Sequence, residues 1–158
     1  MARLADLPDW ERDHLLQLAE RAPRMPSEPW ATGPALSERR VAIVSTAGLH
    51  RHGDRPFAAG AGATDYRVIP GDTPAGALSM SHVSVNFDRT GFRSDPNVVF
   101  PIDRLRELQA EGVVGSVADH HYSFMGAPFP PTGFEPKARE LADLLRRDRV
   151  DAVVLLPV

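Results

Sequence analysis

Histidine is the residue type in this chain best suited to chemistry, and the histidines gather behind predicted strands. Five of the six lie in such segments, next to other polar side chains: His50, His52, His82, His120 and His121. An imidazole group can act as a general acid or base near neutral pH, or it can bind a metal ion. The chain contains no cysteine, so its own residues supply neither a thiolate nucleophile nor a disulfide. The side chains present could therefore serve in proton transfer by imidazole groups, with metal binding as an alternative.

Three residues are candidates for the general acid or base. His82 and Asp88 lie six positions apart across a predicted loop, and a carboxylate that orients an imidazole group is a common acid–base arrangement. A structural hydrogen bond between these two residues would explain the same spacing. His121 is the third candidate, and Tyr122 follows it directly. The alternative for this pair is that both side chains are buried and hold a loop to the core.

The candidates for substrate binding come from the ends of two predicted strands. Thr46, Gly48 and His50 follow the first strand, and Ser116 and Tyr122 belong to the end of the fourth. Glycine permits an unusual backbone conformation and the close approach of a ligand, which is the role expected of Gly48. The alternative is an ordinary turn glycine with an exposed histidine beside it.

A metal site is another use of the same side chains. Zinc or iron could be bound by a mixed nitrogen and oxygen set made of His50, His82, Asp88 and His121. No compact ligand motif such as His-Glu-x-x-His occurs in the sequence. We therefore expect no bound metal ion and no bound cofactor, and a histidine-based metal enzyme stays open as an alternative.

Strands and helices are predicted to alternate along the chain. Apolar runs predict strands at 41–45, 66–69, 78–85, 113–117 and 150–158, and helical periodicity predicts helices at 9–22, 101–111 and 135–148. Loops are expected at 48–62, 86–96 and 120–133. The first strand is apolar throughout, which is typical of a parallel sheet covered on both faces. The sequence thus predicts an α/β protein, a three-layer fold with a mainly parallel sheet.

The carboxyl ends of parallel strands meet at one edge of a sheet, and ligands bind there in open α/β folds. We therefore expect the polar side chains that follow the strands to converge. The segment 150–158 is predicted to be an interior strand, with His50, His82 and His121 near its carboxyl end. Apolar surface is expected to remain exposed beside this strand, because no later segment of the chain covers it.

The chain divides at about residue 37 into an arm and a domain. Residues 1–37 hold a helix and a proline-rich connector, and residues 38–158 form the α/β domain. The net charge is −3 with 25% charged residues, which indicates neither nucleic acid nor a membrane surface as a partner. The sequence has no apolar run of membrane-spanning length and no signal-peptide core, so we expect a soluble cytoplasmic protein.

Four separated stretches carry a resemblance to a known family. They are Val41–His50 (VAIVSTAGLH), Asn97–Leu108 (NVVFPIDRLREL), Gly115–Gly126 (GSVADHHYSFMG) and Val150–Val158 (VDAVVLLPV). From about Glu38 to its end, and in the same order, the chain resembles the selenoprotein B family of glycine, sarcosine, betaine and D-proline reductases. In that family the strand that Val150–Val158 resembles is followed directly by a selenocysteine or cysteine, and three residues later by a cysteine.

The resemblance implies a reductase that cleaves C–N bonds with a dithiol/disulfide couple. In the family a selenolate attacks the α-carbon of a small amine or amino acid, and a pyruvoyl group on a partner subunit activates the amine. A selenol is largely ionised at pH 7, whereas a cysteine thiol with an ordinary pKa of about 8.5 is not. The implied partners are a subunit that carries the pyruvoyl group or further copies of the chain.

The sequence departs from the family pattern by ending at Val158. The resemblance therefore implies truncation at a UGA codon, with the C-terminal part of the domain missing. The catalytic nucleophile, selenocysteine in the full-length form, is expected immediately after Val158. Three functions stay open: a selenol- or thiol-dependent reductase, a catalytically inactive binding or regulatory subunit, and a histidine metal enzyme.

Overall fold

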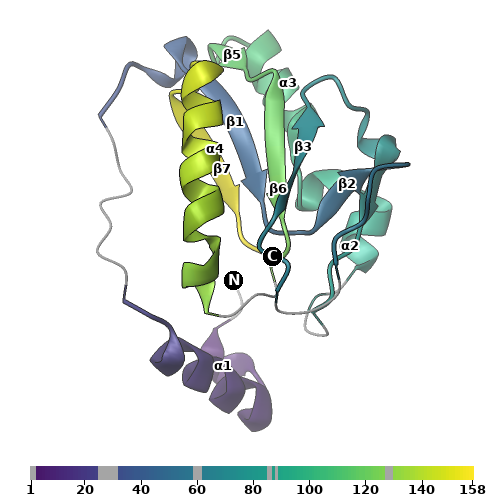
Figure 1. The fold of residues 1–158 in the computed structure, drawn as a ribbon, viewed down its shortest axis with the longest axis vertical. Coiled ribbons are helices and arrows are strands. Elements are labelled where there is room, and N and C mark those ends of the chain that lie inside the picture. The colour runs from purple at the N-terminus through teal and green to yellow at the C-terminus, as the bar shows by residue number, and fades with distance from the viewer. Residues whose placement is uncertain (1–2, 25–31, 59–61, 85–86, 88, 127–129) are drawn as a thin grey trace.

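The computed structural model describes residues 3–24, 32–58, 62–84, 87, 89–126 and 130–158. Its main sheet is built around one central strand, β1 (Figure 1). The strands of this sheet are β1 (Arg40–Ser45), β3 (Tyr66–Pro70), β5 (Ser116–Val117), β6 (His120–Phe124) and β7 (Ala152–Leu156). β1 pairs in parallel with β5 and β6 along one side and with β7 along the other, and β3 joins β6 in the antiparallel direction.

A small second sheet and several helices complete the chain. The second sheet consists of antiparallel β2 (Leu49–Arg51) and β4 (Leu78–Met80). The α-helices are α1 (Asp9–Arg21), α2 (Thr90–Ser94), α3 (Ile102–Ala110) and α4 (Glu135–Arg147). Short 3-10 turns occur at Leu4–Asp6, Leu36–Glu38, Ala75–Ala77, Pro96–Val98 and Pro131–Phe134.

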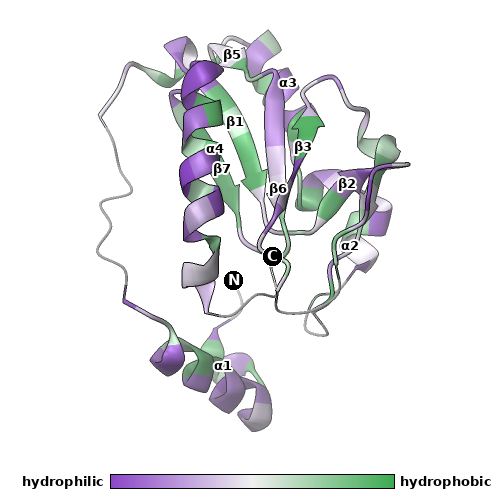
Figure 2. Ribbon diagram, in the orientation of Figure 1, coloured by the Kyte–Doolittle hydropathy of each residue, from purple (hydrophilic) through white to green (hydrophobic). Residues whose placement is uncertain are grey.

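The main sheet lies between two helices, which confirms the three-layer α/β fold. Alternate side chains of β1 point to opposite faces of the sheet. Ile43 packs in one buried cluster with Leu105 of α3, and Val44 packs in another with Leu141 of α4. Figure 2 shows hydrophobic β1 and β7 behind α4, whose visible face is mostly hydrophilic. The continuous apolar run of the first strand therefore reflects burial on both faces.

Helix ends follow the signals in the sequence. Gly112 has a φ of 73° just after α3, a left-handed conformation that glycine adopts without a steric cost. Pro136 occupies the first turn of α4, where a missing backbone N–H is tolerated. Arg146 and Arg147 lie in the last turn of α4, where positive charge interacts favourably with the helix dipole. These signals mark the end of α3 and the two ends of α4.

The largest error in the prediction concerns the segment 120–133, which was expected to be a loop. Its first part is the strand β6, and His121, Tyr122 and Ser123 are buried there. The polar side chains hid the strand because two of them bond to backbone groups of buried residues, one in β1 and one in β2. His121 accepts from the Ile43 N–H, and Ser123 Oγ accepts from the Leu49 N–H. The polar residues of this segment therefore suggested an exposed loop, whereas the structure buries them in a strand.

Smaller corrections concern the remaining strands and loops. The predicted loop 48–62 contains β2, and the predicted strand 78–85 shortens to β4, which pairs with β2 outside the main sheet. The predicted loop 86–96 contains α2, and the strand 113–117 shortens to β5. These strands and this helix are only two to five residues long. So short an element leaves no clear apolar pattern in the sequence.

The last strand lies at an edge of the sheet, not in its interior as predicted. Among the described residues, β7 pairs with β1 alone, in a register that runs from Ala152 opposite Val41 to Leu156 opposite Ser45. Its middle residues keep apolar surface exposed, and Leu155 is 68% exposed. The apolar run indicated a strand correctly, but it did not indicate how many neighbours the strand has.

The N-terminal helix stands apart from the domain. α1 was predicted at 9–22 and is observed, but none of its residues is buried, and Trp10 is 70% exposed. Figure 1 shows α1 beyond the end of the sheet. Among the residues that the structure describes, no helix is long and apolar enough to cross a membrane.

Candidate functional site

The carboxyl ends of β1 and β7 meet, and this is where the candidate site lies. Thr46 directly follows β1, and Val158 lies two residues beyond β7. The Val158 N–H donates to Thr46 Oγ1 at 2.8 Å, and the Thr46 hydroxyl lies 3.2 Å from the Val158 carbonyl oxygen. His82 Nε2 lies 3.2 Å from the same carbonyl oxygen. The parallel pairing of β1 and β7 therefore brings together residues from three distant parts of the chain.

Hydrogen bonds fix the protonation of the His82 ring. The Ser84 N–H donates to Nδ1 at 3.2 Å, so Nδ1 is an acceptor and the proton of the neutral ring lies on Nε2. Nε2–H then donates to the Val158 carbonyl oxygen. Burial lowers the pKa of His82, and nearby Arg89 lowers it further, whereas the bond to Val158 raises it. At neutral pH the ring is therefore a neutral hydrogen-bond donor to residue 158.

Gly48 brings the His82 segment against β1. Its φ is 66°, and its carbonyl oxygen accepts from the Ser81 N–H at 2.9 Å. A side chain at this position would place its Cβ 3.1 Å from the His82 backbone nitrogen. Sequence analysis expected Gly48 to allow the close approach of a ligand, and the group that approaches in the structure is the backbone of His82.

His50 lies beside the same segment and is buried. Its Nε2 lies 2.9 Å from Ser81 Oγ, and its Nδ1 lies 3.0 Å from the Arg51 carbonyl oxygen. Because a carbonyl only accepts, Nδ1 carries the proton, and Nε2 accepts from the Ser81 hydroxyl. Ser81 thus connects His50 with the segment that carries His82, and sequence analysis did not single it out. Its position next to His82 was the available signal.

His121 does not join this group. It lies within β6 with no exposed surface, and its Nδ1 accepts from the Ile43 N–H at 2.9 Å in the middle of β1. Its ring packs edge-on against Phe100, and Nε2 has no hydrogen-bond partner. Burial lowers the pKa of His121 to about 4, and Arg106 also lowers it. The ring is therefore neutral and faces the core, at a distance along the sheet from the ends of β1 and β7.

The other predicted site residues are dispersed. Tyr122 is buried on the α4 side of the sheet, in edge-on contact with Tyr66, and burial raises its pKa. Ser116 pairs with Arg40 at the amino end of β1, opposite the end that Thr46 follows. Asp88, the predicted partner of His82, lies outside the described residues.

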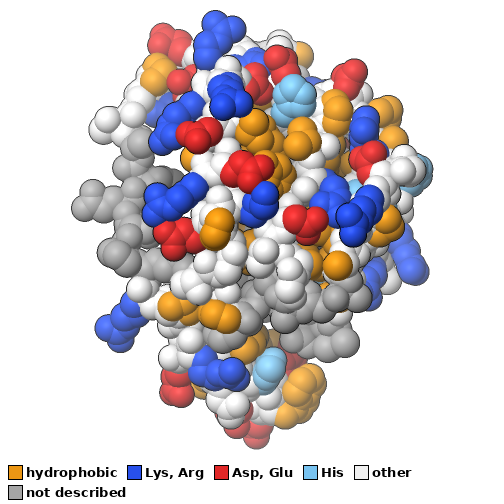
Figure 3. Space-filling view, viewed as in Figure 1, with side chains coloured by type: hydrophobic (Ala, Val, Ile, Leu, Met, Phe, Trp, Pro, Cys, Tyr) orange, Lys and Arg blue, Asp and Glu red, His pale blue; other side chains and the backbone are white. Residues whose placement is uncertain are grey.

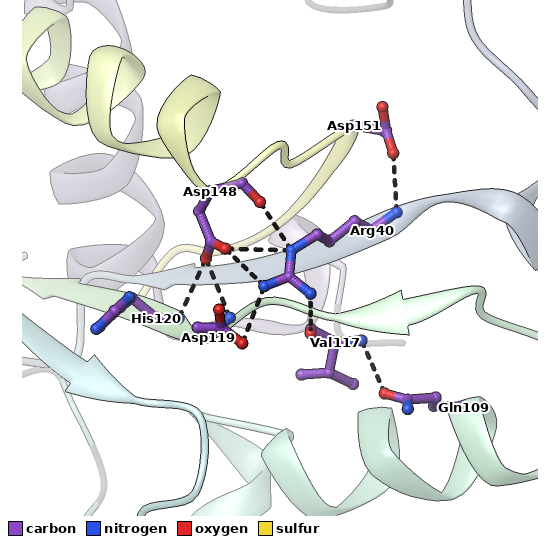
Figure 4. Close-up of polar contacts among 7 residues, drawn as sticks. All are labelled: Arg40, Gln109, Val117, Asp119, His120, Asp148 and Asp151. Carbon is purple, nitrogen blue, oxygen red and sulfur yellow. Dashed lines mark hydrogen bonds and ion pairs between the residues drawn. The ribbon is translucent and has the colours of Figure 1, made fainter.

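The amino end of the sheet holds a polar network of a structural kind (Figure 4). Arg40 pairs with Asp148 at 2.6 Å and with Asp119 at 3.0 Å, and it donates to the Val117 carbonyl oxygen at 2.8 Å. Burial raises the pKa of Asp148, but hydrogen bonds from Arg40 outweigh this and lower it overall. The backbone N–H groups of Asp119 and His120 also donate to Asp148. Arg40 and Asp148 therefore each bond to several partners within the fold.

An apolar groove of about 290 Å³ runs along the candidate site between α4 and β7. Thr46 is the polar residue that lines it; the others are Val44, Phe124, Phe134, Ala138, Leu141, Ala142, Leu145, Val153 and Leu155. Within the described ranges, no three His, Cys, Asp or Glu side chains lie together so as to hold a metal ion. The site therefore holds residue 158 by hydrogen bonds with Thr46 and His82, beside an apolar wall.

The sequence model of the glycine/sarcosine/betaine reductase selenoprotein B family matches residues 23–157. The chain belongs to this family. The match covers Thr46, Gly48, His50 and His82, and it stops one residue before Val158. The family that the four sequence stretches resembled is thus confirmed.

Relatives in this family come from several reductases. The chain is 36% identical to D-proline reductase subunit gamma of Acetoanaerobium sticklandii, over 76% of this chain and 49% of the relative. It is 30% identical to glycine reductase complex component B subunit gamma of Symbiobacterium thermophilum, over 76% of this chain and 28% of the relative. It is 27% identical to sarcosine reductase complex component B subunit beta of Peptoclostridium acidaminophilum, over 92% of this chain and 33% of the relative.

The chain thus spans about half the length of the first of these relatives and about a third of the others. All three are named as subunits or components of reductase complexes. No solved structure matches the chain.

Proposed function

We propose that this chain is the scaffold part of a selenol- or thiol-dependent reductase that cleaves C–N bonds of small amines or amino acids. The nucleophile is selenocysteine or cysteine at the residue position that follows Val158. One observation carries the proposal: the backbone of Val158 is held by Thr46 and His82 where β1 and β7 end. That is the position of ligand sites in open α/β sheets, and the family match makes a reductase the fitting activity.

The chemistry requires electrons and protons that the described residues do not supply. Reductive cleavage of a C–N bond consumes two electrons and two protons and leaves a C–H and an N–H bond. Oxidation of a dithiol to a disulfide releases two electrons and two protons, so the couple balances. A selenol supplies a nucleophile that is ionised at neutral pH. A pyruvoyl group on a partner subunit is proposed as the group that activates the amine.

His82 has a positioning role in this proposal before any role in proton transfer. Both ring nitrogens are engaged, Nδ1 by the Ser84 N–H and Nε2 by the Val158 carbonyl oxygen. A ring held in this way fixes the direction in which the next residue leaves Val158. It becomes a proton donor to a substrate only if the bond to Val158 is released. Thr46 holds the same residue from the side of β1.

The test is to extend the chain past Val158 by a short segment that begins with selenocysteine. We expect iodoacetamide to label this one residue near neutral pH, and we expect the same chain extended by serine to remain unlabelled. Reductive cleavage of glycine, sarcosine or betaine with release of the amine, driven by a dithiol and the partner subunit, should follow the same pattern, and D-proline should be opened to a linear amino acid in the same way. Labelling that requires strongly alkaline pH, or equal amine release from the serine form, would overturn the proposal.

A second candidate is a binding or regulatory subunit without catalysis. The absence of cysteine from the sequence favours it, because the chain itself cannot form a thiolate. In this case the chain binds the other components of a reductase complex, and the selenocysteine extension is labelled near neutral pH but does not change turnover. Reconstitution with and without the 158-residue chain separates the two functions.

A further inference from the structure

We infer that Gly126 is a positioning residue for the nucleophile of the proposed reaction. Its missing side chain leaves the space in which residue 158 lies against Thr46 and His82. The contact between Gly126 and residue 158 is given by the geometry alone. That this contact positions a nucleophile rests on the proposed function.

Three groups of the candidate site surround the position that a side chain of residue 126 would occupy. A Cβ built there would overlap the Val158 carbonyl oxygen, and it would lie 2.9 Å from the Thr46 carbonyl oxygen and 3.0 Å from His82 Nε2. The groups come from the end of β7, the end of β1 and the segment after β4. At no other described glycine are these three groups the nearest neighbours of an added Cβ.

Space, and not backbone conformation, requires glycine at position 126. The described glycines with positive φ are Gly48, Gly53 and Gly112, and Gly126 is not among them. Alanine could therefore adopt the backbone conformation of Gly126, and its effect would come from contact alone. This makes Gly126→Ala a clean steric probe, because it adds one methyl group beside Val158.

Gly126 is held on one side by the core, which limits how far it can move to make room for a methyl group. Met125, which precedes it, is fully buried and forms a β-bridge with Ala47. Thr46 is fixed by β1, whose neighbours on both sides hold it in the sheet. Val158 is the group with the fewest constraints, because it lies past the last ladder pair of β7. An added methyl group should therefore displace Val158 and break its contacts with Thr46 and His82.

The first measurement is hydrogen exchange of the Val158 amide, which donates to Thr46 Oγ1. We expect exchange at least ten times faster in Gly126→Ala than in the unaltered 158-residue chain. Gly76→Ala is the matched control, since nothing lies within 4 Å of a Cβ at that exposed position. Equal exchange rates in Gly126→Ala and Gly76→Ala would overturn the inference.

A second comparison remains informative if Gly126→Ala unfolds the chain. Deleting Val158 removes the group that the methyl would overlap. Gly126→Ala should then lower the unfolding midpoint much less in the chain without Val158 than in the full chain. Equal losses in both backgrounds would show a general structural role and would contradict the positioning role.

The third measurement links the position to the chemistry. In the chain extended by selenocysteine, Gly126→Ala should change the rate of iodoacetamide labelling at neutral pH at least fivefold, and Gly76→Ala should leave it unchanged. A selenol that labels only at high pH in every variant counts against the proposed function, whereas the Val158 amide still decides the role of Gly126. Normal labelling rates in Gly126→Ala would overturn the positioning role alone.

Discussion

Two buried histidines show how the surroundings of a side chain decide its use. His82 and His121 are both neutral, and in each ring Nδ1 accepts from a backbone N–H. The difference lies at Nε2. In His82 it meets the carbonyl oxygen of Val158 at the end of the sheet, and in His121 it has no partner and faces the core. His82 can therefore act on a neighbouring group, whereas His121 stabilises the pairing of β1 with β6.

Acid should destabilise the fold through His121. Burial lowers its pKa to about 4 from an ordinary 6.5, so the unfolded chain binds one more proton between these values. The stability contributed by this group is complete above the ordinary pKa and is lost as the pH falls toward the lowered one. At about pH 5 the loss should be about 2 kcal/mol, since each pH unit below the ordinary pKa costs about 1.4 kcal/mol. Urea unfolding at about pH 7.5 and about pH 5 measures it.

Two variants separate His121 from the other titrating groups. His121→Asn keeps an acceptor for the Ile43 N–H but does not titrate, so the difference between the two pH values should shrink by about 2 kcal/mol. His120→Asn changes an exposed neighbour, which is a lesser cause of the lowered His121 pKa, and should leave most of the difference in place. A pH dependence in His121→Asn that is as large as in the unaltered chain would contradict the assignment.

At the scale of elements, Arg40 joins three of them at the amino end of the sheet. It lies at the start of β1, bonds to the Val117 carbonyl oxygen at the end of β5, and pairs with Asp148 just after α4. The Asp148 carboxylate also accepts the N–H groups that open β6. One ion pair therefore sets the position of α4 relative to three strands.

Removing this pair should cost far more than removing a surface pair. Arg40→Met leaves Asp148, whose side chain is 12% exposed, without its cation, and we expect a loss of about 2 kcal/mol. The control is Arg146→Met, because Arg146 and Asp143 are 76% and 64% exposed, and an exposed pair contributes about 0.5 kcal/mol or less. Chemical unfolding of both variants is the measurement. Equal losses would mean that Arg40 is not a link between elements.

The same elements show which parts of the fold can be predicted from sequence. β1 and α4 were predicted because their apolar patterns match their burial. The meeting of Thr46 with Val158 followed from parallel strands alone. β6 was missed because the histidine and serine side chains that it buries accept hydrogen bonds from backbone groups far away in sequence. The role of Gly126 was missed because it depends on which groups surround a missing side chain, and spacing along the chain does not encode that.

At the scale of the whole molecule, the surface over α4 and the β7 edge of the sheet differ in the kind of side chain that they expose. Figure 3 shows charged side chains of both signs over the face that α4 covers. At the β7 edge, in contrast, Val153, Val154 and Leu155 keep 37%, 38% and 68% of their surface exposed. An apolar strand with one unpaired edge is a site at which chains associate. The expectation of exposed apolar surface beside the last strand is therefore confirmed.

We expect copies of the 158-residue chain to associate through β7 as the protein concentration rises. Leu155→Lys places a charge on the exposed edge and should shift the association to at least tenfold higher concentration. Val98→Lys is the control, since Val98 is an exposed apolar residue, 56% exposed, in the turn before α3. Sedimentation equilibrium gives the mass of each variant. A chain that stays monomeric at all concentrations, or equal effects of the two substitutions, would contradict this use of the edge.

The central place of β1 also has a consequence for biosynthesis. Its neighbours are β5 and β6 on one side and β7 on the other, and the Arg40 N–H bonds to an Asp151 carboxylate 111 positions later. A nascent chain thus presents β1 to the solvent, with both edges free, while most of the domain is still being translated. Contacts of such long range also form slowly. We therefore expect the domain to fold after residues 152–156 have left the ribosome, and chaperones that bind apolar strands should meet this chain at β1 first.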